Sequence, residues 1–440
     1  MIDIVREVAL KALYKIDKEE AYSNIALDEI IKENKNRLDN RDIGFISEIV
    51  YGVTSWKLTI DEIIKKYSKI KLKKISPWIL NILRMSIYQI IFLDKVPKSA
   101  AVNEGVNLAK RYGHRGSCNF ANAILRQVDK KDYETFFEIE DPIERISKTT
   151  SMPVWIIEEL AKDNSIEKVE EICKASNIKP KVTIRVNRLK TTKQDLEQKL
   201  KEREIIFKEG TLEDFLVLEK AKNIEKLDLF QEGYFTIQDE GAGLIAKILD
   251  PKPNEFVLDA CSSPGGKTTY MAELMENKGK IIAWDLHEHR VKLVEENAKR
   301  LGITIIETKC ADASIYNEKY KEKFDKILLD VPCLGIGVLK RKPDIKWKRK
   351  PEDIKEITRI QQNILETCSK YLKPKGEIVY STCSIFSEEN EKIIESFVEK
   401  NVEFDYAMIH KPNSTEKSKT MQLYQGKEND GFFICKLQKK

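Results

Sequence analysis

Two cysteines each follow a short apolar run, where an α/β protein commonly carries a reactive side chain. Cys333 ends an Asp-Val-Pro-Cys sequence after residues 324–329, and Cys383 lies in Ser-Thr-Cys-Ser after residues 377–380. Both runs have the composition of buried strands in a parallel sheet, where ligands bind beyond the carboxyl ends. Adjacent strands lie only about 5 Å apart. If these two are adjacent, both thiols open into one cleft with Asp330, which suggests covalent chemistry on an electrophilic ring.

The other cysteines have a plainer interpretation, because most cysteines are small buried hydrophobic residues without a chemical role. We expect five of the eight cysteines in this chain to be inert residues of this kind, namely Cys118, Cys173, Cys310, Cys368 and Cys435. The sequence contains no Cys-x-x-Cys or Cys-x-x-His pair. Neither a zinc site nor a thioredoxin-like site is therefore indicated, and we expect no metal.

A glycine-rich segment begins the C-terminal region. Residues 257–268 have the pattern of a strand, a tight loop and the start of a helix. Glycines let a ligand approach the backbone, and free amides at a helix start favour an anion or carboxylate. We expect this loop to bind a cofactor through Cys261, Ser262, Ser263, Pro264, Gly265, Gly266 and Lys267.

The end of this loop also resembles a P-loop, so a nucleotide hydrolase is an alternative. A P-loop requires a glycine five residues before its second glycine. Cys261 occupies that position, which weakens the alternative.

Two acidic residues stand at the ends of the next expected strands. Asp285 lies about 20 residues past the glycines, where an acid binds ribose hydroxyls in dinucleotide folds. Asp312 follows the third strand and is placed to accept from an adenine amine. Acids at strand ends are often turn or cap residues, but the regular placement after three successive strands favours an adenosyl cofactor.

Composition indicates a folded chain of about three domains. Its 440 residues are 41% hydrophobic and 34% charged, with a net charge of +5, which is not the composition of a disordered chain. No apolar run reaches the roughly 18 residues of a membrane span, and the segment from Met1 lacks the layout of a signal peptide. With its free thiols, this predicts a cytoplasmic protein that does not associate with membranes.

Positive charge is concentrated in one short stretch that begins soon after Cys333. It contains one tryptophan, Trp347, one acid, Asp344, and seven basic residues: Lys340, Arg341, Lys342, Lys346, Lys348, Arg349 and Lys350. Cations beside an aromatic ring suit phosphates and stacked bases, so we expect nucleic-acid contact. The alternative is an ordinary solvated face.

The periodicity of apolar residues divides the chain into three regions. Residues 1–132 have helical spacing throughout, with an almost entirely apolar helix near 78–91. Residues 133–235 suggest a small α+β module, either an RNA-binding unit or a structural spacer. Residues 236–440 alternate strands and helices, the pattern of a doubly wound parallel sheet, with strands at 256–259, 281–284, 304–308, 324–329 and 377–381, and further strands near 402–404 and 432–437.

Taken together, these motifs resemble those of the RNA cytosine-C5 methyltransferases that use S-adenosylmethionine. The resemblance rests on Ser263 to Lys267, Asp285, Asp312, Asp330 to Cys333, and Ser381 to Ser384. The helical first region resembles the antitermination factor NusB. Enzymes with this pairing methylate a cytosine of bacterial 16S ribosomal RNA. The resemblance implies a Rossmann-like catalytic domain, preceded by a NusB-like all-α bundle and the α+β module.

The resemblance also implies roles for the site residues. Cys383 would attack C6 of the cytosine, Cys333 would assist loss of the C5 proton and release, and Asp330 would bind the N3/N4 edge and adjoin the cofactor. The chain departs from the family pattern at Leu334, where serine is usual, at Ser263, where alanine is usual, and at Met152, where histidine is usual.

Two alternatives stay open at the level of sequence. One is the same chemistry on transfer RNA, and the other is a non-catalytic RNA-binding or antitermination-like factor. The intact cysteine pair argues against the second. We expect a monomer with 16S ribosomal RNA as its partner.

Overall fold

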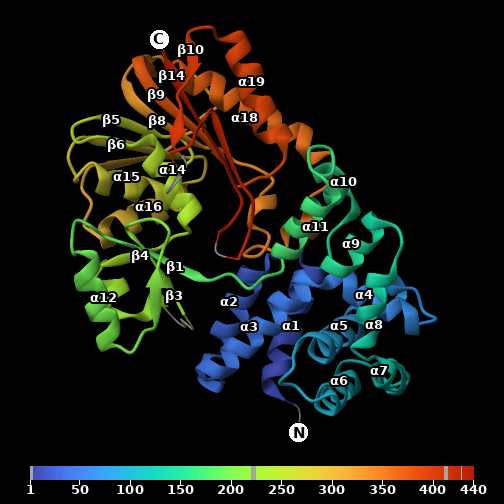
Figure 1. The fold of residues 1–440 in the computed structure, drawn as a ribbon. Coiled ribbons are helices and arrows are strands. Elements are labelled where there is room, and N and C mark those ends of the chain that lie inside the picture. The colour runs from blue at the N-terminus through green and yellow to red at the C-terminus, as the bar shows by residue number, and fades with distance from the viewer. Residues whose placement is uncertain (1–2, 220–223, 411–414, 428) are drawn as a thin grey trace. The chain divides into compact units, whose positions relative to one another are not determined.

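The computed structural model describes residues 3–219, 224–410, 415–427 and 429–440. The chain forms two compact units (Figure 1). The first contains Met1–Asn177 together with Leu339–Arg349, and the second contains Ile178–Val338 and Lys350–Lys440. The predicted divisions after residues 132 and 235 stay predictions.

The first unit is helical, as the periodicity of its apolar residues predicted. Helix α5, Pro77–Phe92, is buried on nearly all sides and packs against α1, α3, α4, α6 and α7. Pro77 begins it, where a missing amide is harmless. The α-helices of the part of Met1–Asn177 that is described are α1 Ile4–Lys18, α2 Ser23–Glu33, α3 Asn40–Ser55, α4 Lys57–Tyr67, α5, α6 Lys98–Tyr112, α7 Arg115–Gln127, α8 Lys131–Glu134, α9 Pro142–Thr150, α10 Val154–Leu160 and α11 Ile166–Ala175.

Part of the basic stretch packs into this helical unit. It forms the short helix α17, Ile345–Lys348. The indole of Trp347 donates to the carbonyl of Thr54 at 2.7 Å, and the ammonium of Lys346 donates to Asn177 at 2.8 Å. Asp344 accepts from both the amide and the hydroxyl of Ser23.

The prediction that the whole stretch faces nucleic acid is therefore wrong for its buried members. Lys340 and Lys346 are 7% and 1% exposed, and burial lowers the pKa of Lys346 to about 7. A run of charges in a sequence resembles a solvated face, but here the Ser55 carbonyl and the Asn177 side-chain oxygen replace water around the amino group of Lys346.

The second unit begins with a small antiparallel sheet. Its strand order is β2-β3-β1-β4, and helix α12, Lys193–Glu202, supplies Leu196 and Leu200 to its core. The strands are β1 Val182–Val186, β2 Phe207–Glu209, β3 Phe215–Leu218 and β4 Phe235–Ile237. This confirms the α+β module.

The larger sheet carries the motifs. Its strand order is β10-β14-β9-β8-β5-β6-β7, with β13 pairing β14. The strands are β5 Phe256–Asp259, β6 Lys280–Asp285, β7 Ile306–Cys310, β8 Phe324–Asp330, β9 Leu372–Thr382, β10 Phe404–Tyr406, β13 Thr420–Leu423 and β14 Phe432–Lys439. The sheet is mixed rather than parallel throughout, because β14 runs antiparallel to β9 and β10. Strands β7, β6, β5, β8 and β9 are parallel.

Helices cover both faces of this sheet (Figure 1). Alternate strand residues point to opposite faces. Leu258, Ile327 and Ile378 pack with residues of α18, Asp353–Ser369, and α19, Glu391–Lys400. The opposite face is covered by α14 Glu240–Leu249, α15 Gly266–Leu274 and α16 Glu288–Leu301. With both faces buried, ligands have access at the strand ends.

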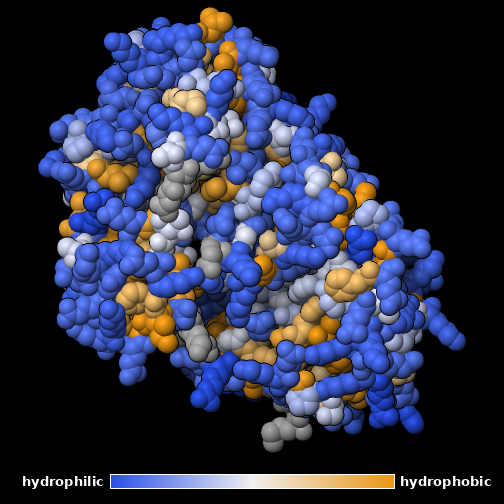
Figure 2. Space-filling view, in the orientation of Figure 1, coloured by the Kyte–Doolittle hydropathy of each residue, from blue (hydrophilic) through white to orange (hydrophobic). Residues whose placement is uncertain are grey.

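The face of the molecule seen in Figure 2 is mostly hydrophilic, with scattered apolar side chains. Within the described ranges, no helix has the length and apolar character needed to cross a bilayer.

Candidate active site

The two motif cysteines meet at the carboxyl edge of the sheet. Strands β8 and β9 are parallel neighbours, with Asp330 opposite Ser381. The Cys333 and Cys383 sulfurs, which follow these strand ends, lie 2.9 Å apart. This confirms the prediction that β8 and β9 are adjacent and bring the two thiols together.

Asp330 joins the cysteine loops to the glycine-rich loop. One carboxylate oxygen accepts from the Lys267 ammonium at 2.7 Å, and the other accepts from the Ser381 hydroxyl at 2.9 Å. Burial would lower the pKa of Lys267, but the negative charge of Asp330, with that of a Cys383 thiolate, raises it above its ordinary value. A fixed cation therefore lies beside the thiol pair.

The environment of Cys333 favours its neutral thiol. The hydrogen bond with Cys383 contributes most to raising its pKa well above the ordinary value, followed by burial and the negative charges of Cys383, Glu389 and Asp330. Cys333 therefore carries a proton at neutral pH. A thiol that holds its proton suits a group that later exchanges protons with a substrate.

Glu389 is a site residue that our sequence analysis missed. It is fully buried at the end of the short 3₁₀ helix η7, Ser387–Glu389. Its carboxylate accepts from the Leu334 amide at 2.9 Å and also from the Ser384 hydroxyl. Leu334 itself is 1% exposed, so the departure from the family serine places an apolar side chain in the protein interior.

The glycine-rich loop has a backbone that requires glycine at one position and leaves helix amides uncapped. Gly265 has φ +99°, and a Cβ there would lie 3.2 Å from the Cα of Val294, so glycine is required. It precedes α15, and no side chain of the described residues caps the first-turn amides of that helix. The amide and hydroxyl of Ser262 both donate to the carbonyl of Trp284, at 2.8 and 2.9 Å, which fixes the loop against β6.

Asp259 ends β5 beneath this loop, and sequence reasoning missed it as well. One of its oxygens accepts from the Thr268 hydroxyl at 2.7 Å. The other is buried and has no hydrogen-bond partner within the described ranges. Burial raises the pKa of this carboxyl to about 7. An unpartnered acceptor beside uncapped amides fits a zwitterionic amino-acid group such as the methionine end of S-adenosylmethionine.

The two strand-end acids differ in their surroundings. Asp285, 4% exposed, accepts from the amide of His287 at 3.2 Å. Asp312 accepts from the amide and hydroxyl of Ser314 at 2.8 and 2.6 Å, so one of its oxygens caps a turn. Cys261 lies on the loop, and burial raises its pKa well above the ordinary value, which argues for an inert lining residue.

A buried arginine links the small sheet to the glycine-rich loop. Arg185 of β1 is fully buried, and its guanidinium donates to the Gly266 carbonyl at 2.8 Å and to Glu273 of α15 at 2.7 Å. It also donates to Gln238. An arginine in a strand carries no such signal in the sequence, because its partners lie more than fifty residues away.

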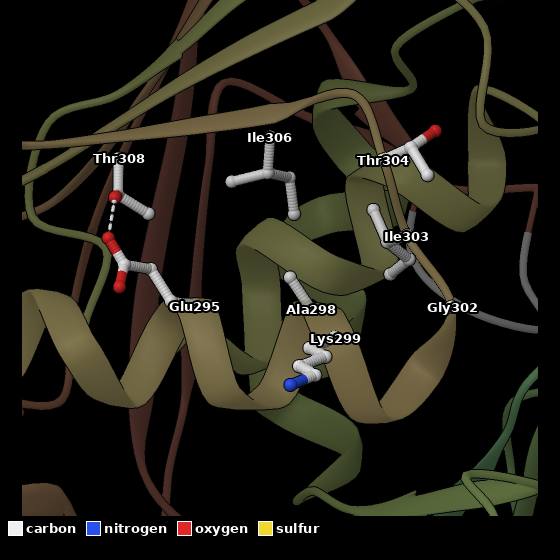
Figure 3. A pocket seen from close by; sticks show the side chains of 8 residues that line it. All are labelled: Glu295, Ala298, Lys299, Gly302, Ile303, Thr304, Ile306 and Thr308. Carbon is white, nitrogen blue, oxygen red and sulfur yellow. Dashed lines mark hydrogen bonds between the residues drawn. The ribbon is translucent and has the colours of Figure 1, made fainter.

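A separate pocket lies at the edge of the sheet, between α16 and β7 (Figure 3). It encloses about 440 Å³. At one end, the hydroxyl of Thr308 donates to Glu295 at 2.5 Å. None of its eight lining residues is a motif residue, so it is not the site described above. Among the described residues, no group of His, Cys, Asp and Glu side chains is arranged to hold a metal ion.

Comparison with known proteins identifies the family. Residues 246–438 match the family 16S rRNA methyltransferase RsmB/F, residues 3–130 match the NusB family, and residues 152–225 match the ferredoxin-like domain of RsmF/B-like methyltransferases. A probable ribosomal RNA small subunit methyltransferase B of Bacillus subtilis is 39% identical over 99% of both chains. The chain belongs to the RsmB/F methyltransferase family.

Solved structures agree with the RsmB/F assignment. The crystal structure of PH0851 has a TM-score of 0.82 and 27% identity, covering 100% of both chains. NSun6 from Pyrococcus horikoshii, solved with SFG, has a TM-score of 0.58 and 25% identity, covering 65% of this chain and 98% of its own. The RsmB/F chain is thus a methyltransferase with S-adenosylmethionine as its cofactor, and its family modifies ribosomal RNA.

Proposed function

We propose that this protein methylates C5 of a cytosine in 16S ribosomal RNA, through a covalent cysteine–cytosine adduct. The observation that carries the proposal is the thiol pair, 2.9 Å apart, beside an aspartate bound to a lysine of the cofactor loop. The family description and the Bacillus subtilis relative support ribosomal RNA as the substrate.

The chemistry explains why two thiols are needed. C5 of cytosine is too electron-poor to attack a methyl group directly. A thiolate of Cys383 adds to C6, the electrons of the C5–C6 bond move to C5, and C5 becomes a nucleophilic enamine carbon. After methylation, removal of the C5 proton re-forms the double bond and expels the Cys383 thiolate. We assign assistance in that last step to Cys333.

Asp330 and Lys267 complete the proposed catalytic set. Asp330 accepts a hydrogen bond from the N4 amino group of the cytosine, which orients the ring for addition of the thiolate at C6. Lys267 keeps Asp330 oriented and places a positive charge beside the Cys383 sulfur. Because both sulfurs lie past strand ends, the cytosine must be unstacked or unpaired to reach them.

The cofactor, when bound, supplies an electrophilic methyl group on a sulfonium. We propose that the amides after Gly265 and the free oxygen of Asp259 hold its amino-acid end. Asp285 and Asp312 would bind the ribose and the adenine. The remaining loop residues, Cys261, Ser262, Ser263, Pro264 and Gly266, would shape the backbone around it.

The test is a methylation assay with three RNAs. The purified protein is incubated with labelled S-adenosylmethionine and 16S ribosomal RNA, 23S ribosomal RNA or transfer RNA, and the nucleosides are identified by mass spectrometry. We expect 5-methylcytidine in the 16S RNA alone. Label in transfer RNA would favour the alternative substrate, and label on another nucleoside would overturn the C5 assignment.

A further inference from the structure

The two thiol-bearing segments come from different strands, so something must set the separation of their sulfurs. Beyond the strand pairing, the amide of Gly337 donates to the carbonyl of Cys383 at 2.9 Å. Among side chains, the Ser381 hydroxyl donates to Asp330 ahead of the two cysteines, and Glu389 links the residues that follow them. Its Oε2 accepts from the Leu334 amide, directly after Cys333. Its Oε1 accepts from the hydroxyl of Ser384, directly after Cys383.

A third donor reinforces the Cys333 side of this link. Gln361 of α18 donates through Nε2 to Glu389 at 3.0 Å and to the Pro332 carbonyl at 2.9 Å. The Glu389 carboxylate therefore accepts from the loop after β8, the loop after β9 and helix α18. Only an acceptor-only group with two oxygens satisfies all of them at once, and bonds to a charged acceptor are the stronger kind.

Glu389 is itself held in place. The hydroxyl of Tyr380 donates to its carbonyl at 2.7 Å. The next residue, Asn390, accepts from the Thr382 hydroxyl at 2.6 Å and donates to the Ser384 carbonyl at 3.2 Å. Because Glu389 is anchored in this way, it can fix the position of the groups that bind to it. Hydrogen-bond partners orient the ligands of a metal site in the same manner.

We propose that Glu389 is a positioning residue, which clamps the Cys333 and Cys383 segments at the separation that methyl transfer requires. The inference rests on the function proposed above. Glu389 need not touch RNA or cofactor, because it acts through the Leu334 amide and the Ser384 hydroxyl. Its negative charge also adds to the preference of Cys333 for the protonated form.

The first experiment separates positioning from stability. Glu389→Ala removes the clamp, Glu389→Gln keeps its shape without the charge, and Glu388→Gln is the control. Glu388 is the neighbouring residue of η7, and it is ion-paired with Lys392 at 2.7 Å. Turnover is measured per cofactor-binding site, counted by calorimetry, so that unfolded protein does not contribute.

We expect kcat to fall about 10²-fold in Glu389→Ala, since a displacement of about 1 Å has that effect on positioned groups. Glu389→Gln should recover part of the loss. The KM for S-adenosylmethionine should change less than twofold in all three variants, and Glu388→Gln should match the parent chain. Unchanged kcat in folded Glu389→Ala and Glu389→Gln would overturn the proposal, since a merely stabilising role lowers only the fraction of active sites.

The second experiment needs no RNA. The protein is equilibrated with mixtures of reduced and oxidised glutathione, and the Cys333–Cys383 disulfide is quantified by peptide mass spectrometry. Each disulfide formed oxidises two protein thiols and reduces one oxidised glutathione to two molecules of reduced glutathione. The equilibrium constant therefore gives the effective concentration of the Cys333 thiol relative to the Cys383 thiol. We expect at least a tenfold drop in Glu389→Gln and a larger one in Glu389→Ala, with Glu388→Gln unchanged.

The two experiments distinguish failure of the proposed function from failure of the Glu389 clamp. If the parent chain makes no 5-methylcytidine, the proposed function is wrong, while the thiol equilibrium still tests the clamp. If Glu389→Ala does not fold, Glu389→Gln decides. An effective concentration within twofold of the parent chain in that variant would overturn the inference.

Discussion

The two thiols at the sheet edge have different charged neighbours. Cys333 lies near the carboxylates of Glu389 and Asp330, which add to the rise of its pKa. Cys383 lies near the ammonium of Lys267. Negative neighbours make a thiol hold its proton more tightly. The raised pKa of Cys333 is consistent with the proton-handling role proposed for it.

Substitution of each cysteine should give opposite results on a denaturing gel. Cys383→Ala removes the attacking sulfur, so methylation and any covalent RNA–protein complex should both disappear. Cys333→Ala permits attack but hinders release, so the complex should accumulate in the presence of labelled RNA and S-adenosylmethionine. A complex trapped in Cys383→Ala but not in Cys333→Ala would mean that the two roles are reversed.

Asp259 should make stability depend on pH. Burial raises its pKa to about 7, against about 3.9 in an unfolded chain. Between these values the folded state keeps a proton that the unfolded state has lost, so the free energy of unfolding should fall as pH rises from about 4 to 7. Asp259→Asn removes this ionisation and should stabilise the cofactor-free protein by on the order of 4 kcal/mol at pH 8, and little at pH 4.

Urea unfolding across this pH range measures the effect of Asp259→Asn. The control is Asp405→Asn, because the Asp405 side chain is 68% exposed. Parallel pH profiles for the parent chain and Asp259→Asn would show that the buried carboxyl does not titrate as inferred.

At the scale of elements, the sequence predicted the strands that carry the site but not all of their surroundings. Strand β5 has the predicted bounds, because a short apolar run between turn residues is unambiguous. Strand β7 begins at Ile306 rather than 304, because an edge strand has weak apolar alternation. The antiparallel direction of β14 was missed, since periodicity gives no direction. Glu389 was missed because two of its three donors, on Leu334 and Gln361, lie 55 and 28 residues away in the sequence.

The link between β1 and α15 depends on one buried ion pair. Arg185→Met should destabilise the protein by about 3–5 kcal/mol, because Glu273 is left as a buried charge without its partner. Adding Glu273→Leu should restore much of that loss. Arg203→Ala, which breaks the exposed pair with Asp228, should change stability little. Chemical denaturation of these variants measures the effect, and equal losses from Arg185→Met and Arg203→Ala would contradict it.

For the whole molecule, we expect exposed positive charge to contribute to RNA binding. Lys342 and Lys350 are exposed in the basic stretch, unlike the buried Lys346. Replacing both with alanine should lower the slope of log affinity against log salt by about 1.4 if each contacts a phosphate of single-stranded RNA. Filter binding at several salt concentrations measures the slope, and cofactor affinity should not change. The control is the double variant Lys252→Ala with Lys278→Ala, whose side chains are 60% and 61% exposed. Equal salt slopes in the two double variants would mean that the basic stretch is an ordinary solvated face without phosphate contacts.

Leu339–Arg349 belongs to the first unit although the residues on either side of it belong to the second, and this affects how truncated forms of the protein can be interpreted. The polypeptide leaves the second unit after Val338, packs Ile345 and Trp347 among the helices of the first unit, and returns at Lys350. The two units are therefore interleaved along the gene, and no single split site separates them. A catalytic fragment begun at Ile178 would carry a loop, close to Cys333, stripped of its packing partners. Truncation would impair the enzyme even if the first unit never touched RNA, so loss of activity in such a fragment is no measure of RNA binding by the deleted helices.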